Sequence, residues 1–255
     1  MSDISFGWDF DDLNGYSYHI NYWEEFFDVT KVGLAVRSVL EEDFVFNLAD
    51  FLNGRFKVDL DTAFSIAKAV FTRMSSPELH FHTPVHVLSL FRFAFDHKIP
   101  LEDWERLAIW FHDSIYIPGA PPESNEIQST SFMRGIVPGG LSCEDGAINR
   151  AERAILTTGR HPAKAIEKQY HLIMDMDLCN LAWPREKFEA SVEALQTECT
   201  KVMTVRKFKA GWRRFYEIIL SRGHIYRTEQ FRDQFERTAR QNIAKSLQSL
   251  VEPSL

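Results

Sequence analysis

The sequence predicts an all-α fold, a helical bundle with helical extensions at its N-terminal and C-terminal ends. Apolar side chains recur three and four residues apart along most of the 255-residue chain, which is the period of a helix. Alternation of apolar and polar residues between turn signals, the pattern of β-strands, is scarce. The apolar fraction of 45%, with 21 Phe and 6 Trp, is sufficient for a sizeable core and argues against a disordered chain.

Residues 1–55 carry the weakest periodic signal, and we expect an N-terminal accessory helical segment there, followed by a single domain over residues 56–255. The domain begins with a helix at about 62–74. Thr83 is the expected N-cap of the next helix and Pro84 its first residue, because proline is tolerated at this position. The buried stripe of that helix contains Val85, Leu88, Phe91 and Phe95.

A central helix is predicted over 101–116. Its apolar residues surround nearly every face, so His112 and Asp113 enter the interior with it; the apolar residues are Trp104, Leu107, Ala108, Ile109, Trp110, Phe111 and Ile115. Burial of an imidazole and a carboxylate is costly unless each finds a partner. A bound metal ion would be a partner for both.

Further helices are predicted at about 123–135, 144–158, 164–172, 185–203, 206–221 and 228–250. Pro118 to Pro122 cannot continue a helix, and this loop is a candidate rim for a site at the end of the helix that carries the His-Asp pair. Gly135 to Gly140 forms a second break, which is too irregular for a phosphate-binding P-loop.

Charge and cysteine content exclude several classes of protein. A net charge of −7 without a long Lys or Arg run disfavours binding of a nucleic acid polymer. The basic stretch 201–214 either attracts a phosphorylated small molecule or is a solvated helix face. Cys143, Cys179 and Cys199 are too widely spaced for a disulfide framework or a Cys-rich zinc site. With no signal-peptide pattern and no long apolar run, a cytoplasmic protein that does not enter a membrane is expected.

Polar residues on both sides of the His-Asp pair extend it to a possible metal site. His82 and His86 precede the pair, and Asp175 and Asp177 follow it. Imidazole and carboxylate ligands suit a divalent transition metal such as Mn, Fe, Ni, Co or Zn. The N-cap separates His82 from His86, which favours different roles for them. Asp175 and Asp177 point to different sides of a helix, so only one faces the ion, and we prefer Asp177.

Five motifs occur in an order that resembles one known family. They are His82-Thr-Pro-Val-His86, Trp110-Phe-His112-Asp113, Ser124-Asn125-Glu126-Ile-Gln-Ser129, Thr157-Thr-Gly-Arg160-His161 and Asp175-Met-Asp177. Over about residues 60–248 the chain resembles the HD-domain superfamily of metal-dependent phosphohydrolases, in particular its predicted phosphohydrolases of unassigned substrate.

This resemblance implies an HD-domain helical bundle that holds one divalent metal ion, with a second ion possible. The implied ligands are His86, His112, Asp113 and Asp177. The chain is also distantly similar to the cyclic-nucleotide phosphodiesterases, in which the first histidine of a His-x-x-x-His motif donates a proton to the leaving group. In this sequence that histidine is His82, and the alternative is a histidine without a part in the reaction.

The remaining candidate residues lie in the middle motifs. The catalytic set is His82, Asp113 and Glu126, and the substrate-binding set is Asn125, Arg160 and His161. Asn125 and Glu126 would orient a water or help to hold a second ion, although a Ser-x-x-Glu pattern also starts helices by capping. Arg160 offers a bidentate phosphate donor, and His161 would ligate a second metal, contact a phosphate or have no role.

The function predicted from these residues is metal-dependent hydrolysis of a phosphate ester or anhydride in a nucleotide or another small phosphorylated metabolite. Two alternatives stay open. One is an HD-type di-iron oxygenase, in which additional histidine and carboxylate ligands hold two irons. The other is a non-catalytic regulatory HD protein that binds a nucleotide.

Overall fold

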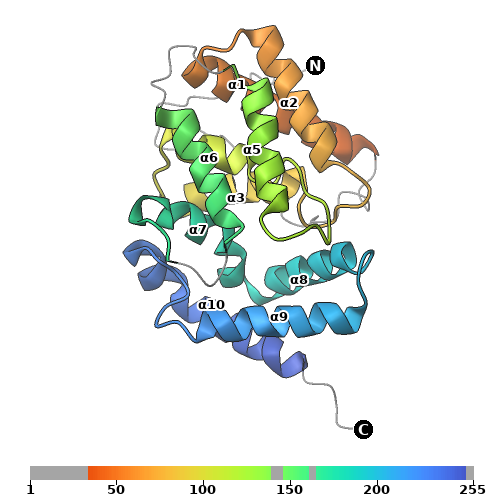
Figure 1. Ribbon diagram of the computed structural model, residues 1–255, viewed down its shortest axis with the longest axis vertical. Helices are drawn as coiled ribbons and strands as arrows, with labels where there is room; N and C mark the ends of the chain where they lie inside the picture. The colour runs from red at the N-terminus through yellow and green to blue at the C-terminus, as the bar shows by residue number, and fades with distance from the viewer. Residues whose placement is uncertain (1–33, 139–145, 161–164, 251–255) are drawn as a thin grey trace, which may run out of the picture.

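The computed structural model describes residues 34–138, 146–160 and 165–250, and within these ranges it confirms the predicted all-α fold (Figure 1). The helices are α1 (Leu34–Phe56), α2 (Leu60–Met74), α3 (Pro84–Asp96), α4 (Asp103–Phe111), α5 (Ser124–Ile136), α6 (Gly146–Thr158), α7 (His171–Asp177), α8 (Arg185–Cys199), α9 (Val205–Leu220) and α10 (Glu229–Ser249). Two short 3-10 helices, η3 (Lys168–Tyr170) and η4 (Cys179–Ala182), flank α7.

The helices form an elongated bundle (Figure 1). α1, α2 and α5 lie toward one end, and α8, α9 and α10 lie at the other. α1 packs along α2, α4 packs on α6, and α10 packs on η4. α3, α4 and α7 contact one another between these groups, and their ends come together inside the molecule.

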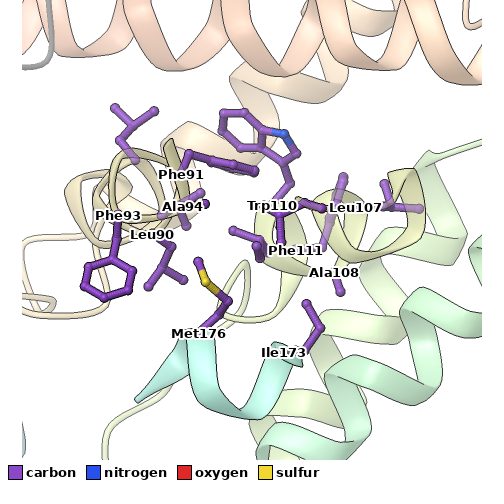
Figure 2. Packing of buried hydrophobic residues seen from close by; sticks show 14 of the residues in the cluster. Leu90, Phe91, Phe93, Ala94, Leu107, Ala108, Trp110, Phe111, Ile173 and Met176 are labelled. Atoms are coloured by element: carbon purple, nitrogen blue, oxygen red, sulfur yellow. The ribbon is translucent and has the colours of Figure 1, made fainter. Parts of the chain in front are cut away.

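Large apolar side chains from α3, α4 and α7 interlock at this central junction (Figure 2). The Trp110 ring is fully buried and packs on Phe91, with 4.7 Å between ring centroids. Ile173 and Met176 of α7 extend toward the same cluster. Burial of apolar surface at about 25 cal/mol per Å² makes this junction a major source of stability, so the helix ends that it holds are well fixed.

The described part of the expected accessory segment belongs to the same core. Residues 34–55 are helical and fall within α1, which ends at Phe56. Phe44 of this helix is completely buried and meets Trp110 of α4 edge-on, with 5.0 Å between ring centroids. The buried side chains of α1 from Leu40 onward therefore belong to the core of the domain, whereas residues 1–33 lie outside the described part of the chain.

The predicted length of the central helix is wrong, because α4 ends at Phe111 and does not reach Tyr116. Side chains take the carbonyl groups that a continuing helix would use. His112 donates from Nδ1 to a carbonyl three residues earlier, and Ser114 donates from Oγ to the carbonyl of Phe111. Successive helical residues point about 100° apart. His112 keeps helical backbone angles (φ −56°, ψ −38°), and yet its Nε2 lies 3.0 Å from Oδ2 of Asp113, so the two side chains reach the same point.

The helix predicted at 164–172 is also wrong in its position. Residues 165–167 are not helical, η3 follows, and α7 begins only at His171 and continues to Asp177. The buried apolar residues of this segment are Ile173, Met174 and Met176, so packing against α3 and α4 selects the later stretch. The other predicted helices occur with ends shifted by a few residues.

The sequence predicted neither a disulfide framework nor a membrane-spanning segment. Cys179 and Cys199 are free thiols in the structure, and Cys143 lies outside the described residues. Among the described helices, none combines the length and the apolar character needed to cross a membrane.

Glu105 makes the stability of α4 depend on pH. Its carboxylate accepts a hydrogen bond of 2.7 Å from the backbone N–H of Glu102 at the helix start. Burial raises the pKa of Glu105 from 4.5 to about 7, although this hydrogen bond acts in the opposite direction. The folded protein therefore binds a proton more tightly than the unfolded chain, and the free energy of unfolding falls as pH rises through this interval.

We expect Glu105→Gln to keep the hydrogen bond and to remove the pH dependence. Relative to the unchanged protein, the variant should gain stability between pH 5 and pH 8, by at most about 3 kcal/mol. Urea unfolding at several pH values measures this difference. A constant difference across the range would show that Glu105 is not the titrating group.

Candidate metal centre

Three helix ends bring four side chains of metal-ligand type together. His86 lies in the first turn of α3, where Pro84 occupies the first helical position. His112 and Asp113 follow the end of α4, and Asp177 is the last residue of α7. One ligand atom from each of these four residues lies within 4.8 Å of the others. The structure thus brings together the complete ligand set that the resemblance implied.

The distances between the ligand atoms suit a single ion. Nε2 of His112 lies 3.3 Å from Nε2 of His86 and 3.0 Å from Oδ2 of Asp113. Oδ1 of Asp177 lies 3.5 Å from Nε2 of His112 and 3.9 Å from Nε2 of His86. Ligands about 2.1 Å from one ion, at right or tetrahedral angles, are about 3.0 to 3.4 Å apart. The set therefore fits one divalent transition metal ion after small adjustments.

Both histidines direct Nε2 at the cluster, where it could bind a metal ion. His112 donates from Nδ1 to the carbonyl oxygen of Ile109 at 2.9 Å, so Nε2 is the nitrogen that would become a ligand on losing its proton. Burial and then the neighbouring His112 lower the pKa of His86 to about 4. The His86 ring is therefore neutral at pH 7, and the neutral ring is the form that binds metal ions.

The two carboxylates require a nearby positive charge. Burial would raise the pKa of Asp113, but His112 and His82 outweigh burial and lower it. Burial would likewise lower the pKa of His112, but Asp113 and Asp177 raise it well above its usual value. In the metal-free protein a proton on His112 supplies the compensating charge. A divalent ion carries twice that charge and contacts both carboxylates, so it is the better partner.

His82 is outside the ligand cluster and is held by Glu198, a residue that sequence reasoning missed. Nδ1 of His82 lies 2.5 Å from Oε1 of Glu198, whose side chain has no exposed surface. Oε2 of the same carboxylate accepts backbone N–H groups of His80, Phe81 and His82 at 2.9, 3.0 and 3.2 Å. One carboxylate on α8 therefore fixes the loop before α3 and also orients the His82 ring.

A sequence signal for Glu198 did exist. The buried face of α8 carries small or apolar side chains three and four residues apart, and a glutamate ends this row: Phe188, Ser191, Ala194 and Glu198. A carboxylate on the buried face of a helix requires hydrogen-bond donors, so it points to a buried polar site. The position of the donors, more than a hundred residues earlier in the chain, has no signal in the sequence.

One face of the His82 ring stacks on the ring of Tyr116. The two rings are 3.5 Å apart between centroids and 16° from parallel. The His82 ring is also close to the cluster, with its centroid 6.1 Å from that of His86. Burial would lower the pKa of His82, but Glu198 and then Asp113 raise it. The charges around His82, beside the ligand set, therefore favour the protonated form of its ring.

Glu126 lies near the cluster, in the first turn of α5. α5 begins at Ser124, and its N-cap residue Glu123 forms no side-chain capping bond. Burial raises the pKa of Glu126, and the nearby charges of Asp113 and Asp177 add to this effect. The carboxyl group packs against Gly159, where an added Cβ would lie 2.6 Å from Glu126 Cδ. The absence of a side chain at Gly159 thus makes room for Glu126.

The structure supports the proposed substrate-binding residues less strongly. The Asn125 amide is bonded to the backbone of Ile117 on both sides, accepting from its N–H at 3.0 Å and donating to its carbonyl at 3.4 Å. Asn125 therefore holds the loop after α4. Arg160 is exposed and pairs with Glu123 at 3.6 Å. His161 lies outside the described residues. Contact of these three residues with a substrate stays a prediction.

Asp175 and Asp177 are separated as the helical spacing indicated. Asp177 joins the ligand cluster, whereas Asp175 faces the start of α10. The carboxylate of Asp175 accepts the backbone N–H of Arg227 at 2.8 Å and, from Thr228, the N–H at 2.7 Å and the hydroxyl at 2.8 Å. Asp175 is 1% exposed, so it fixes α7 to α10 from within the core.

Comparison of the chain with protein-family models, with curated proteins and with solved structures finds no match. The chemical interpretation of the site therefore depends on its own geometry.

A matched pair of substitutions separates the metal site from the fold. Asp177→Asn should abolish metal binding and leave the stability of the metal-free protein nearly unchanged, because Asp177 is a ligand. Asp175→Asn should retain the metal and lose about 3 kcal/mol of stability, because it leaves buried N–H groups without their charged acceptor. Metal content per chain and urea unfolding in chelator measure both quantities. Retention of metal by Asp177→Asn would remove Asp177 from the site.

Proposed function

We propose that the protein is a metal-dependent hydrolase of a phosphate ester or anhydride, acting on a nucleotide or another small phosphorylated metabolite. The observation that carries this proposal is the position of His82 beside the four ligands, held by the buried carboxylate of Glu198. A structural metal site needs only ligands. An adjacent histidine that is oriented by a buried carboxylate and is not itself a ligand is typical of a site that transfers protons.

The metal would be held by His86, His112, Asp113 and Asp177. When bound, it would polarise a phosphoryl oxygen and lower the pKa of a water, which is how such ions assist hydrolysis. The donor set of two imidazoles and two carboxylates suits Mn, Fe, Co, Ni or Zn. It contains no thiolate, the ligand that would favour a softer metal ion. We propose one ion as the minimum, and Glu126, whose pKa the charges of Asp113 and Asp177 raise, is our candidate ligand for a second ion.

The side chains around the cluster form a complementary acid and base. Burial raises the pKa of Glu126, which makes this carboxylate a better proton acceptor for the attacking water. Glu198 and Asp113 raise the pKa of His82 against the effect of burial, which favours the protonated ring that would donate to the leaving group. A base and an acid with different surroundings can thus act on one substrate near neutral pH.

Phosphate release by the metal-loaded protein tests the proposal. The chelated protein would be reloaded with Mn(II), Co(II) or Zn(II) and given p-nitrophenyl phosphate, nucleoside mono-, di- and triphosphates and a cyclic nucleotide. We expect phosphate or phosphate-ester products with at least one of these substrates. His82→Gln should keep the metal and lower turnover by about 10²- to 10⁴-fold.

Two results would contradict the proposal in different ways. Two bound iron ions per chain, with oxygen consumption and no phosphate release, would indicate an oxygenase. Tight nucleotide binding without turnover for every substrate would indicate a regulatory protein.

Gly159→Ala tests the role of Glu126 without changing that residue. The new methyl group meets the Glu126 carboxyl group and must displace it, so turnover should fall by about tenfold or more while the metal is retained. Gly135→Ala on α5 is the control, because an added Cβ there has no atom within 4 Å. Equal turnover of both variants would show that the position of Glu126 is unimportant.

A further inference from the structure

The ring of His82 is fixed from two sides by elements that are far apart in the sequence. Glu198 on α8 holds Nδ1 at 2.5 Å, and the Tyr116 ring covers one face at 3.5 Å between centroids. Because Glu198 occupies Nδ1, Nε2 is the ring atom that remains to donate a proton. The Tyr116 contact adds nothing to metal binding, so its effect falls on the orientation of the ring.

The backbone on both sides of Tyr116 is bound to α5. Ser129 donates from Oγ to the carbonyl of Ile115 at 3.1 Å and accepts the N–H of Ile115 at 3.0 Å. Asn125, one helical turn earlier, binds the N–H of Ile117 at 3.0 Å. Side-chain hydrogen bonds from a single helix thus bracket Tyr116, whose ring stacks on His82.

Tyr116 itself is not the acid. Burial and then the charge of Glu198 raise the pKa of Tyr116, so its hydroxyl holds its proton tightly and is a poor proton donor near pH 7. The phenol ring supplies a flat surface for the His82 ring, and this stacking is most favourable when the imidazole is charged. Tyr116 is therefore a positioning residue, and it acts through His82.

A proton donor that is held so firmly is useful for only one kind of leaving group. Phosphate and pyrophosphate leave as stable anions, because their charge is spread over several oxygens. An alkoxide is a much stronger base and leaves readily only if it receives a proton as the bond breaks. Hydrolysis of an anhydride would gain little from the contacts that Glu198 and Tyr116 make with His82, whereas hydrolysis of an alcohol ester would depend on them.

We propose that the substrate is a phosphate ester of an alcohol, such as a sugar or nucleoside hydroxyl, and that Tyr116 positions His82 for protonation of the departing alkoxide; this inference rests on the proposed function. In the reaction, a water oxygen forms a bond to phosphorus and gives one proton to Glu126. The bond from phosphorus to the ester oxygen breaks, and its electron pair stays on that oxygen. The oxygen then takes the proton from Nε2 of His82, so the products are an alcohol and phosphate.

The test compares leaving groups in the metal-loaded protein. The substrates are a nucleoside 5′-monophosphate, p-nitrophenyl phosphate, whose leaving group needs no proton, and a nucleoside diphosphate, whose anhydride bond is the alternative target. We expect kcat/KM for the alkyl ester to exceed that for cleavage of the anhydride bond. Tyr116→Leu should lower kcat for the alkyl ester by about 10²-fold and for p-nitrophenyl phosphate by less than about threefold.

Tyr116→Phe is the matched variant, because it keeps the ring and removes the hydroxyl. It should retain the activity and the leaving-group dependence of the unchanged protein. A second measurement does not depend on turnover: the Nδ1–H proton resonance of His82, which the bond to Glu198 protects from exchange, should persist in Tyr116→Phe and broaden in Tyr116→Leu. Metal content should be equal in all three proteins, which shows that Tyr116→Leu is folded.

Failure of this inference differs from failure of the proposed function. If the unchanged protein cleaves the anhydride bond faster than the alkyl ester, or if Tyr116→Leu affects both esters equally, the assignment of an alcohol ester is wrong while the phosphohydrolase proposal stands. If none of these three substrates is hydrolysed, and neither is a nucleoside triphosphate or a cyclic nucleotide, the phosphohydrolase proposal is itself contradicted.

Discussion

The constraint on which the site depends is the close burial of two carboxylates and two imidazoles. His86, His112, Asp113 and Asp177 place their ligand atoms within 4.8 Å of one another at the point where α3 begins and α4 and α7 end. Such a cluster is unfavourable in a protein interior unless a cation compensates it. The packing of these three helices, with Trp110 at its centre, supplies the stability that holds the side chains in place.

Buried and half-buried carboxylates also organise the loops around this junction. Glu198 accepts hydrogen bonds from three successive backbone N–H groups before α3. Asp175 accepts two backbone N–H groups at the start of α10, and Glu236 accepts those of Ile225 and Tyr226. Each carboxylate satisfies N–H groups that a turn leaves without a partner, which allows loops to be buried next to the site. In the case of Glu198 the same group also orients His82, so one residue links the fold to the chemistry.

Local patterns in the sequence predicted much of this arrangement. The helical period identified nearly every helix, Thr83 and Pro84 marked the start of α3, and the spacing of Asp175 and Asp177 assigned them to different faces. The end of α4 at Phe111 was not predictable, because it depends on hydrogen bonds that compete with the helix. The pairing of His82 with Glu198 and its stacking on Tyr116 depend on tertiary contacts, for which a single sequence has no periodic signal.

The most direct test of the central claim is X-ray absorption spectroscopy of the metal-loaded protein. The claim predicts one tightly bound divalent ion per chain with two imidazole nitrogens and two carboxylates among its ligands, and loss of one imidazole contribution in His86→Ala. A chain that binds no ion after chelation and reloading would contradict it. Sulfur ligation, or a spectrum that is the same in His86→Ala, would also contradict it.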